Sequence, residues 1–592
     1  MKYQIVSLLM ICLSALNMEA QPSKNAVAKA GKVVYSRPKT FCNPLDLPYR
    51  FQLDGNQREA ADPVIVLYNG SYYLFASKSG GYWRSENMLD WTLVEPEGLP
   101  LEHYAPAVIV IKNKIYFHAG NSTYTTDDPA KGKWTKIATH PTGVDDPALF
   151  SDDDGRLYLY NGCSDKTPIW VKELDPATFL PISQNKEVIK PDIEKRGWEV
   201  AGDLNLGKKP GDTSVKNFVP YVEGAWMNKI NGKYYLQYCA PGTQFKSYAD
   251  GVFVSDSPTG PFTYASYSPF SYKPTGFVTG VGHSCTFSDK DGQYWHVTSA
   301  NISARRMFER RLALFPTGVL PDGQLVTNTY LGDYPQFAPG TVKNPLQNNS
   351  PRWMLLSYQK PASVSSTLGD VNQQNFKSSN AFDEEIKTWW AAATGNKGEW
   401  LQVDLTKNCR IDALQINFAD QGATALGRLR NDGYQYVVEA SLDGKKWKTI
   451  IDRRDVARDE PHHYVQLDKA EIARYVRITN IHSPAGSVFS LYDFRIFGSG
   501  MGKLPSIVDQ FTVKRDPTDP RHVHLSWPAK PNADFYIVRY GIAPDRLFSN
   551  YQVYRSNEVN INSLNAGVAY YFTVDAVNDS GITPGKKVIK ID

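Results

Sequence analysis

The stretch ADPVIVLYNGSYYLFAS, residues 61–77, joins an acid, an apolar segment, a turn and an aromatic segment. Related stretches are DPALFSDDDGRLYLY at residues 146–160 and EGAWMNKINGKYYLQY at residues 223–238. Runs of β-branched and aromatic residues on either side of an Asn-Gly or Asp-Gly turn predict β-hairpins. Because an acid opens all three hairpins, the pattern indicates a functional site as well as a fold.

The hairpin pattern occurs five times in the first half of the chain. The copies begin with ADPVIV at 61, YAPAVIV at 104, DDPALF at 145, VEGAWM at 222 and GHSCTF at 282. A third strand follows the hairpin in the first four copies, and the fifth copy lacks a clear version. Repeats of short strands at intervals of about 40–75 residues favour a β-propeller, so five four-stranded blades are predicted.

The first residues of the repeats are expected to converge in space. The first strand of each propeller blade lines the central channel, so Asp62, Asp146 and Glu223 should meet at one end of the axis. A single acid before Pro or Gly is usually a turn cap. Three acids that we place at equivalent repeat positions favour a functional site instead.

Three neighbouring carboxyl groups suit acid–base chemistry. Burial and nearby negative charge raise the pKa of one of them, which gives a protonated acid beside an ionised base. Glycoside hydrolysis uses such a pair, separated by about 6.5–9.5 Å for inversion or about 5 Å for retention. The alternative is a metal site. Since the repeat starts contain one histidine, His283, calcium or magnesium would suit it better than zinc.

Composition limits the class of protein. The chain has 592 residues, enough for three or four domains, with 42% hydrophobic and 21% charged residues, which are globular values. A net charge of +4 without a basic run argues against nucleic acid as a partner. The cysteine spacings fit neither a disulfide framework nor a zinc site, and Cys163, Cys239 and Cys285 are interpreted as buried free thiols. Nothing in the sequence indicates an oligomeric state.

The N-terminal segment predicts export. In residues 1–20, MKYQIVSLLMICLSALNMEA, Lys2 precedes an apolar run, as in a secretory signal peptide cleaved near Ala20. We therefore expect a secreted or periplasmic protein. Lipid anchoring at Cys12 is disfavoured, because LMIC lacks the small residues expected before a lipidated cysteine. No later stretch reaches about 18 apolar residues, so no membrane span is predicted.

Residues 55–335 resemble glycoside hydrolase family 43, a group of five-bladed propellers. The matching pieces, in order, are ADPVIVLYNGSYYLFAS, YWRSENMLDW, YAPAVIV, DDPALFSDDDGRLYLY, VEGAWMNKINGKYYLQY and GHSCTFSDKDGQYWHV. The resemblance implies that Asp62 is the general base, that Glu223 is the general acid, and that Asp146 orients Glu223 and tunes its pKa. It also implies inversion at the anomeric carbon.

The same resemblance implies a substrate class. Family 43 enzymes mainly release arabinofuranosyl or xylosyl units from plant polysaccharides, without a cofactor for the chemistry, and some act on β-galactosyl links. A non-catalytic glycan-binding protein on this fold is an alternative, although the presence of all three acids argues against it. A metal-dependent lyase or a calcium-held structural protein rests only on the acid run at residues 152–154.

Further site residues are assigned more coarsely. Trp83, Tyr104 and Trp226 are assigned to stacking on sugar faces and Arg305 to sugar hydroxyls, with side-chain packing as the alternative for each. The family commonly has Trp where Tyr104 stands. His283 matches a histidine that helps to hold calcium in relatives, with a core histidine as the alternative.

The second half changes character. Residues 353–498, with NAFDEEIKTWWAAA and GEWLQVDLTKNCRIDALQINF, resemble the discoidin or coagulation factor 5/8 C-terminal sandwich, whose members often bind glycans. There Trp389 and Trp390 are expected in the core, and the region of Asp383 is assigned to a structural calcium.

The remaining segments complete an all-β architecture. Residues 498–506 read as a linker. Residues 507–592 resemble a fibronectin type III sandwich, with Trp527 in its core and Tyr570 as its tyrosine corner. We therefore predict a propeller over residues 21–345 followed by two β-sandwiches, at 353–498 and 507–592.

Overall fold

The computed structural model describes residues 37–592 except 53–56, 101, 142, 208–220, 303–306, 372, 425–431 and 457. The predicted signal peptide and Arg305 lie outside the described residues. The described elements are β-strands and four short 3₁₀ helices, η1 (Pro129–Lys131), η2 (Gly197–Glu199), η3 (Ser378–Phe382) and η4 (Pro484–Gly486). None of these helices is long and apolar enough to cross a membrane. The predicted all-β class is confirmed.

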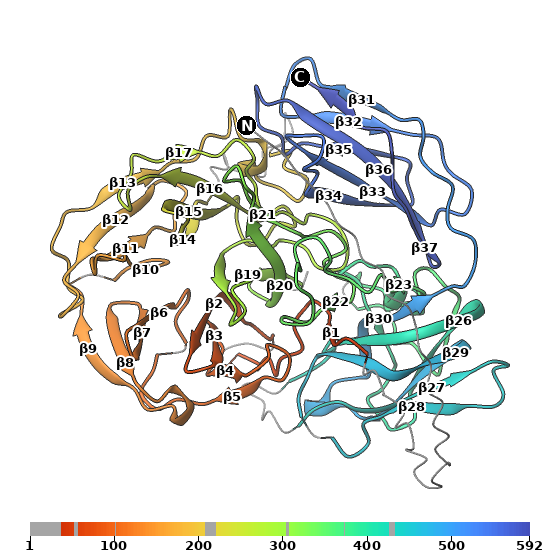
Figure 1. Cartoon of the computed structure of the whole chain (residues 1–592). Coiled ribbons are helices and arrows are strands. Elements are labelled where there is room, and N and C mark those ends of the chain that lie inside the picture. Colours follow the sequence, from red (N-terminus) through yellow and green to blue (C-terminus); the bar gives the residue numbers. More distant parts are fainter. Residues whose placement is uncertain are drawn as a thin grey trace, which may run out of the picture. The chain divides into compact units, whose positions relative to one another are not determined.

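Five antiparallel four-stranded sheets form the first half of the chain (Figure 1). Blade 1 contains β2 (Ala61–Tyr68), β3 (Ser71–Ser77), β4 (Tyr82–Ser85) and β5 (Thr92–Val94). Blade 2 contains β6 (Ala107–Ile111), β7 (Lys114–Ala119), β8 (Ser122–Thr126) and β9 (Thr135–Thr139). Blade 3 contains β10 (Ala148–Ser151), β11 (Leu157–Asn161), β12 (Ile169–Leu174) and β13 (Lys186–Ile189).

Blade 4 contains β14 (Glu223–Ile230), β15 (Lys233–Ala240), β16 (Ala249–Ser255) and β17 (Thr263–Tyr264). Blade 5 contains β18 (Ser284–Ser288), β19 (Tyr294–Asn301), β20 (Arg310–Val319) and β21 (Leu325–Thr327). The third strand that the sequence did not reveal in the fifth repeat is therefore β20. The first strands contact one another in a closed ring, and β18 contacts β2. The predicted five-bladed propeller is confirmed.

Aromatic residues fill the spaces between blades. Every residue of β3, SYYLFAS, is buried. The strand does not alternate between polar and apolar residues, because both faces of its sheet are covered by other parts of the protein. The ring of Phe75 stacks on Tyr82 at 4.5 Å and meets Phe117 of blade 2 at 5.9 Å. These contacts explain why the aromatic content of the repeats is high.

The N-terminal segment is attached to the end of the propeller. Strand β1 (Thr40–Phe41) pairs with β22 (Gln336–Phe337). The side-chain amide of Asn43 donates to the carbonyls of Leu314 at 2.9 Å and Gly332 at 2.8 Å. Residues far apart in the sequence thus hold each other beside blade 5.

The first sandwich is one eight-stranded sheet system dominated by two long strands. Its strands are β23 (Met354–Leu355), β24 (Ala362–Val364), β25 (Trp390–Ala391), β26 (Trp400–Phe418), β27 (Gln435–Ser441), β28 (Lys448–Asp452), β29 (His462–His482) and β30 (Ser490–Ser499). Register shifts divide the pairing of β26 with β29. Trp389 and Trp390 are 4% and 0% exposed, so their predicted core role is confirmed.

The second sandwich has sheets of three and five strands. They contain β31 (Thr512–Arg515), β32 (Val523–Ser526) and β35 (Glu558–Ile561) in one sheet, and β33 (Phe535–Gly541), β34 (Ser549–Tyr554), β36 (Tyr570–Asn578), β37 (Gly581–Thr583) and β38 (Ile589–Ile591) in the other. Trp527 is 2% exposed, and the hydroxyl of Tyr570 accepts a hydrogen bond from the Asn565 amide at 3.0 Å. The sandwich is confirmed, and its type III identity stays a prediction.

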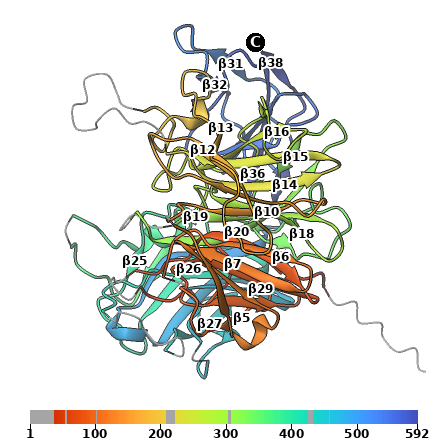
Figure 2. The ribbon, with the colours of Figure 1, turned by 90° about the vertical axis from the view of Figure 1, so that its left-hand side faces the viewer.

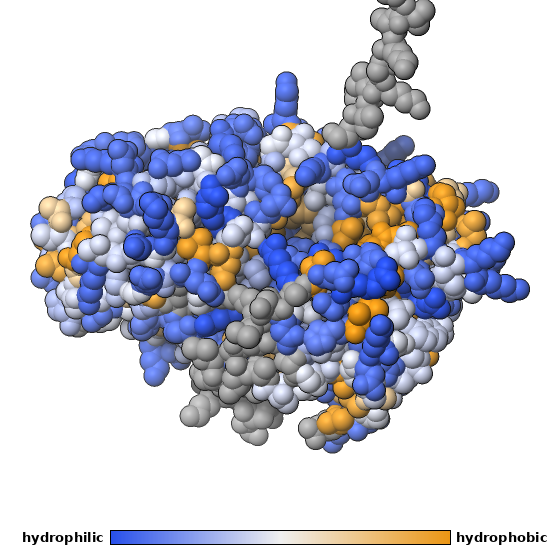
Figure 3. Space-filling model, turned by 90° about the horizontal axis from the view of Figure 1, so that it is seen from below, coloured by the Kyte–Doolittle hydropathy of each residue, from blue (hydrophilic) through white to orange (hydrophobic). Residues whose placement is uncertain are grey.

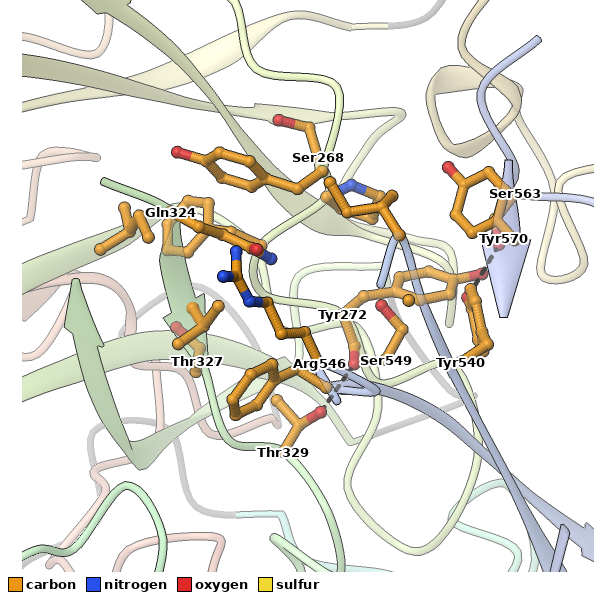
Figure 4. Close-up of a pocket in the computed structure, with 18 residues that line it drawn as sticks. Ser268, Tyr272, Gln324, Thr327, Thr329, Tyr540, Arg546, Ser549, Ser563 and Tyr570 are labelled. Atoms are coloured by element: carbon orange, nitrogen blue, oxygen red, sulfur yellow. Dashed lines mark hydrogen bonds between the residues drawn. The ribbon is translucent and has the colours of Figure 1, made fainter. Parts of the chain in front are cut away.

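The second sandwich also continues the core of the propeller. One hydrophobic cluster joins Tyr160 and Tyr238 of blades 3 and 4 to Trp527 and Phe572, and Figure 2 shows the sandwich strands beyond those blades. Figure 4 shows a small pocket lined by Tyr272 and other propeller residues and by residues of the sandwich. Residues 38–592 form one compact unit.

The predicted linker is held against the second sandwich. The Gly500 amide donates to the Asp579 carbonyl at 2.7 Å, and the Asn578 side chain donates to the Lys503 carbonyl at 2.9 Å. The sequence predicts only that residues 498–506 are a linker. These hydrogen bonds fix it in place.

Hydrophobic residues do not form a continuous surface on the face that Figure 3 shows, where they lie in separate patches among hydrophilic residues.

Candidate active site

Each innermost strand starts at a residue with a positive φ. The angles are 53° at Asp62, 47° at Ala105, 44° at Asp146, 62° at Gly224 and 57° at His283. Residues other than glycine rarely adopt this left-handed backbone conformation. Each one costs about 1–3 kcal/mol of stability and persists only where the surrounding structure holds it. Five occurrences at equivalent places show that the blade geometry imposes this conformation, which turns the chain into the channel.

Glu223 lies one residue before the position that Asp62 occupies in its repeat. In blade 1, Ala61 pairs with Ser77 and the register then shifts. In blade 4, Glu223 pairs with Cys239 before the same shift. Glu223 therefore corresponds to Ala61, and Gly224 corresponds to Asp62. The expectation that all three acids occupy equivalent positions is therefore wrong for Glu223. The two hairpins have Asn-Gly turns of the same length, so the offset lies at the start of the strand.

In blade 4, the position that corresponds to Asp62 must be a glycine, Gly224. A Cβ atom at this position would lie 2.6 Å from the Cys239 sulfur and 2.8 Å from Cγ of His283. The backbone of Gly224 thus packs directly against the His283 ring. In blade 4 the acid at the channel is Glu223, the residue before Gly224.

Asp62 is a buried carboxylate surrounded by donors. It accepts hydrogen bonds from Ser77 Oγ at 2.5 Å and from the Arg310 guanidinium at 3.0 Å, and Nδ1 of His283 lies 3.2 Å from its Oδ1. Burial acts to raise the pKa of Asp62, but the charges of Arg310 and His283 and the serine hydrogen bonds outweigh it, so this pKa lies below its ordinary value. Asp62 stays ionised.

Asp146 and Glu223 form a close carboxyl pair. Ligand atoms of Asp146, Glu223 and Cys163 all lie within 4.8 Å of one another. Burial raises the pKa of Asp146 to about 7, and the nearby charges of Glu223 and Asp62 add to the rise while His283 opposes it. Two carboxyl groups this close cannot both ionise freely. The pair therefore retains a proton under conditions in which Asp62 has none.

Two donors hold the carboxyl group of Glu223. The hydroxyl of Tyr248 donates to Oε1 at 2.5 Å, and the thiol of Cys163 donates to Oε2 at 3.1 Å. The sequence predicts a buried free thiol at Cys163; the thiol is free and half-buried, and it lies in the site. Tyr248 and Arg310 were not singled out at all. All three lie outside the repeat starts, so the repeat pattern carried no signal for them.

His283 lies between two acids. Its Nδ1 is 3.2 Å from Asp62 and 3.7 Å from Asp146. Burial acts to lower the pKa of His283, but the charges of Asp62, Asp146 and Glu223 outweigh it and raise this pKa. The ring thus lies between the base and the acid pair, where the acids favour its protonated form.

The assignment of His283 to a calcium site stays a prediction. Within the described part of the chain, His283 belongs to neither cluster of three potential ligands, which are Asp146–Cys163–Glu223 and Asp46–Glu460–His463. Asp383 accepts hydrogen bonds from the Glu385 amide at 3.0 Å and the Thr388 hydroxyl at 2.8 Å, and its assignment to a structural calcium stays a prediction.

The residues predicted to contact sugar have different surroundings. Trp83 is 1% exposed and meets Tyr49 at 6.3 Å in the core, so its assignment to stacking is wrong. Trp226 lies three residues along β14 from Glu223, and its indole N–H donates to the Thr286 carbonyl at 3.0 Å, which links blades 4 and 5. Side-chain packing explains Trp226 better than stacking.

Tyr104 is the exposed member of this group. It is 42% exposed, and its ring meets Phe308 at 5.7 Å. The Arg310 guanidinium, which binds Asp62, lies 5.3 Å from the Phe308 ring centre. Tyr104 and Phe308 therefore lie close to the site, and the predicted stacking role of Tyr104 stays a prediction. Phe308 lies outside the repeat starts, so the repeat pattern does not point to it.

A five-bladed propeller that holds an ionised carboxylate beside a proton-retaining carboxyl pair has the groups that glycoside hydrolysis requires. Comparison with known proteins agrees. Residues 56–324 match glycosyl hydrolases family 43, and residues 361–493 match the F5/8 type C domain. The chain thus contains a family 43 domain followed by an F5/8 type C domain.

Named relatives match parts of the chain. An arabinoxylan arabinofuranohydrolase of Paenibacillus polymyxa is 28% identical over 316 residues, which is 41% of this chain and 46% of that protein. A beta-xylosidase of Xylanibacter ruminicola is 32% identical over 137 residues, which is 20% of this chain and 39% of that protein. The chain therefore spans less than half the length of these two relatives. A solved glycoside hydrolase structure covers 76% of this chain and 99% of its own, at 20% identity and a TM-score of 0.43.

Proposed function

We propose that this protein is an exo-acting glycoside hydrolase that releases arabinofuranosyl or xylosyl units from plant polysaccharides. The observation that carries the proposal is the contrast between an ionised Asp62 and the Asp146–Glu223 pair, which retains a proton. The names of the two relatives, an arabinofuranohydrolase and a xylosidase, support the sugar class.

In the proposed mechanism, Asp62 takes a proton from the water that attacks the anomeric carbon. Glu223 gives its proton to the leaving oxygen as the glycosidic bond breaks, and the anomeric configuration inverts. We assign the acid role to Glu223, as the family resemblance implies, because Tyr248 and Cys163 hold its carboxyl group in place. Asp146, which offers a carboxyl oxygen within 4.8 Å of one of Glu223, then orients Glu223 for proton transfer.

Hydrolysis of aryl glycosides tests the proposal. The purified protein is incubated with aryl α-L-arabinofuranoside, β-D-xyloside and β-D-galactoside, and NMR follows the configuration of the first product. We expect turnover of one of the first two, loss of at least a thousandfold in Asp62→Asn, and a loss in Glu223→Gln that is largest for poor leaving groups. Full activity in either variant contradicts the assigned roles, and turnover of the galactoside alone favours the β-galactosyl alternative.

A non-catalytic glycan-binding protein is the remaining alternative. Binding of arabinoxylan by the wild type, measured by affinity electrophoresis, together with no sugar release from any substrate would favour it. The proposed chemistry uses no cofactor, so exhaustive dialysis against EDTA is expected to leave turnover unchanged.

The remaining parts of the chain suit a polymeric substrate. We propose that the F5/8 type C domain binds glycan, that the second sandwich is a type III-like spacer, and that residues 1–20 direct export. Binding of the Asp62→Asn variant to insoluble arabinoxylan tests the first point. Detection of the processed chain outside the cytoplasm tests the last.

A further inference from the structure

Cys163 connects the two carboxyl groups of the acid pair. It follows β11 after Gly162 and is half-buried. Its sulfur lies 3.1 Å from Oε2 of Glu223, and the carboxyl oxygens of Asp146 and Glu223 and this sulfur are all within 4.8 Å of one another. A hydrogen bond from the thiol to Asp146 acts to lower the pKa of that carboxyl group. One side chain therefore faces both acids.

The surroundings keep this sulfur protonated. Burial and the negative charges of Asp146 and Glu223 raise the pKa of the Cys163 thiol far above its ordinary value. The other titratable groups that face the acid pair are Tyr248 on Glu223, Cys239 behind Tyr248, and His283 with Asp62 beside Asp146. Cys163 is thus a neutral donor throughout the pH range in which a hydrolase works.

We propose that Cys163 is a positioning residue of the general acid, which bridges Asp146 and Glu223 through its S–H group and holds Oε2 of Glu223 in place for proton transfer. The inference rests on the proposed function. The choice of sulfur has a chemical consequence. A thiol is a weak donor, so it fixes the carboxyl group while stabilising the anion less than a hydroxyl would. The pair can then hold its proton to a higher pH.

Two substitutions separate these effects. Cys163→Ser keeps a donor at the same place but makes it stronger, so the basic limb of kcat/KM should move to lower pH by about 0.5–1 unit, since a stronger hydrogen bond to the anion lowers the pKa of the acid. At its own optimum, this variant should retain kcat within about threefold. Cys163→Ala removes the donor and should lose about tenfold in kcat with little change in KM, because the acid is no longer held in place.

Cys285→Ser is the matched control. Cys285 is a buried thiol on β18 whose sulfur lies 3.8 Å from the Ile65 carbonyl and is not part of the acid cluster. It should change thermal stability without moving the pH profile. Circular dichroism melting of each variant establishes that it is folded before its kinetics are compared.

The outcomes distinguish this inference from the proposed function. A wild type that hydrolyses no glycoside overturns the proposed function, and with it the role of Cys163. An active wild type whose pH limb is unmoved in Cys163→Ser, and whose kcat is unchanged in Cys163→Ala, overturns the role of Cys163 alone. If Cys285→Ser shifts the pH profile as much as Cys163→Ser does, the effect belongs to general destabilisation and the inference is wrong.

Discussion

Asp62 and Asp146 show how surroundings decide the use of a residue. Both are aspartates at the left-handed start of an innermost strand, with φ of 53° and 44°. Arg310 and two serines face Asp62 and lower its pKa, whereas burial, together with a second carboxyl group beside it, raises the pKa of Asp146 to about 7. The repeat supplies the same scaffold twice, and the neighbouring blades supply opposite charges.

His283 offers a direct test of this charge balance. In His283→Asn the positive charge is lost, while Asn tolerates the φ of 57°. The pKa of Asp62 should rise, because one of the two cations that lower it is gone. Since the base must be ionised to act, the acidic limb of kcat/KM should move up by about one pH unit. A limb that stays in place would show that Arg310 alone controls Asp62.

The sequence predicted the acids and His283 because they stand at the starts of the repeats. It could not predict Arg310, Tyr248 or Cys163, because they lie on other strands and loops and reach the site only when the blades close into a ring. Trp83 was placed wrongly for a related reason. A tryptophan suits a sugar site and a blade core equally well by composition, and only burial separates the two.

At the level of single strands, one conformation produces the whole site. The left-handed residue and the register shift after Ala61 and Glu223 turn each strand start into the channel. The hairpins themselves were predictable from their turns and aromatic residues. The one-residue offset of Glu223 was not, because it depends on which pairs form across β14 and β15.

Gly224 is a position in these strands where substitution should be poorly tolerated. In Gly224→Ala the new Cβ would meet the Cys239 sulfur at 2.6 Å and the His283 ring at 2.8 Å, at a φ of 62°. We expect a loss of stability of about 2–4 kcal/mol and a fall in kcat, because both the overpacked Cβ and the φ are unfavourable. Gly232→Ala, at the open turn of the same hairpin, has a φ of 78° but no atom within 4 Å. It should destabilise less and leave kcat unchanged, as measured by urea unfolding and initial rates.

At the level of the whole molecule, buried charges join the three domains. Lys273 and Asp333 of the propeller pair at 3.2 Å, and Lys273 also donates to Gln552 of the second sandwich at 2.8 Å. Arg495 of the first sandwich donates to the carbonyl of Asp333 and pairs with Glu384 at 2.8 Å. The sequence suggested separable domains because each resembles a known module. Such a junction needs side chains from all three.

Truncation tests whether the propeller stands alone. A chain that ends at residue 345 would expose the partners of Arg495 and Gln552, which include Lys273 and Asp333, both at most 1% exposed in the full chain. Buried charges need their partners. We therefore expect this shortened chain to aggregate or to lose most of its activity, whereas a chain that lacks only residues 1–36 should behave as the full chain does. Gel filtration and initial rates report the result, and a monomeric, fully active propeller would contradict the prediction.

Arg58 is the sharpest test of the contact between the propeller and the first sandwich. Its guanidinium is 0% exposed and donates to Asp420 at 2.7 and 3.0 Å and to Asp459 at 2.7 and 2.9 Å. Arg58→Met removes the cation that both buried carboxylates contact, so unfolding should become easier by about 3–5 kcal/mol. The triple variant Arg58→Met, Asp420→Asn, Asp459→Asn should regain part of that loss, because no buried charge is left uncompensated. Arg156→Met, which breaks an exposed pair with Asp154, should cost far less, because exposed ion pairs contribute little to stability. Urea unfolding is followed by tryptophan fluorescence. Arg58 couples the two domains if the transition of Arg58→Met begins earlier than that of the wild type or splits into two, and it does not if the transition matches that of Arg156→Met.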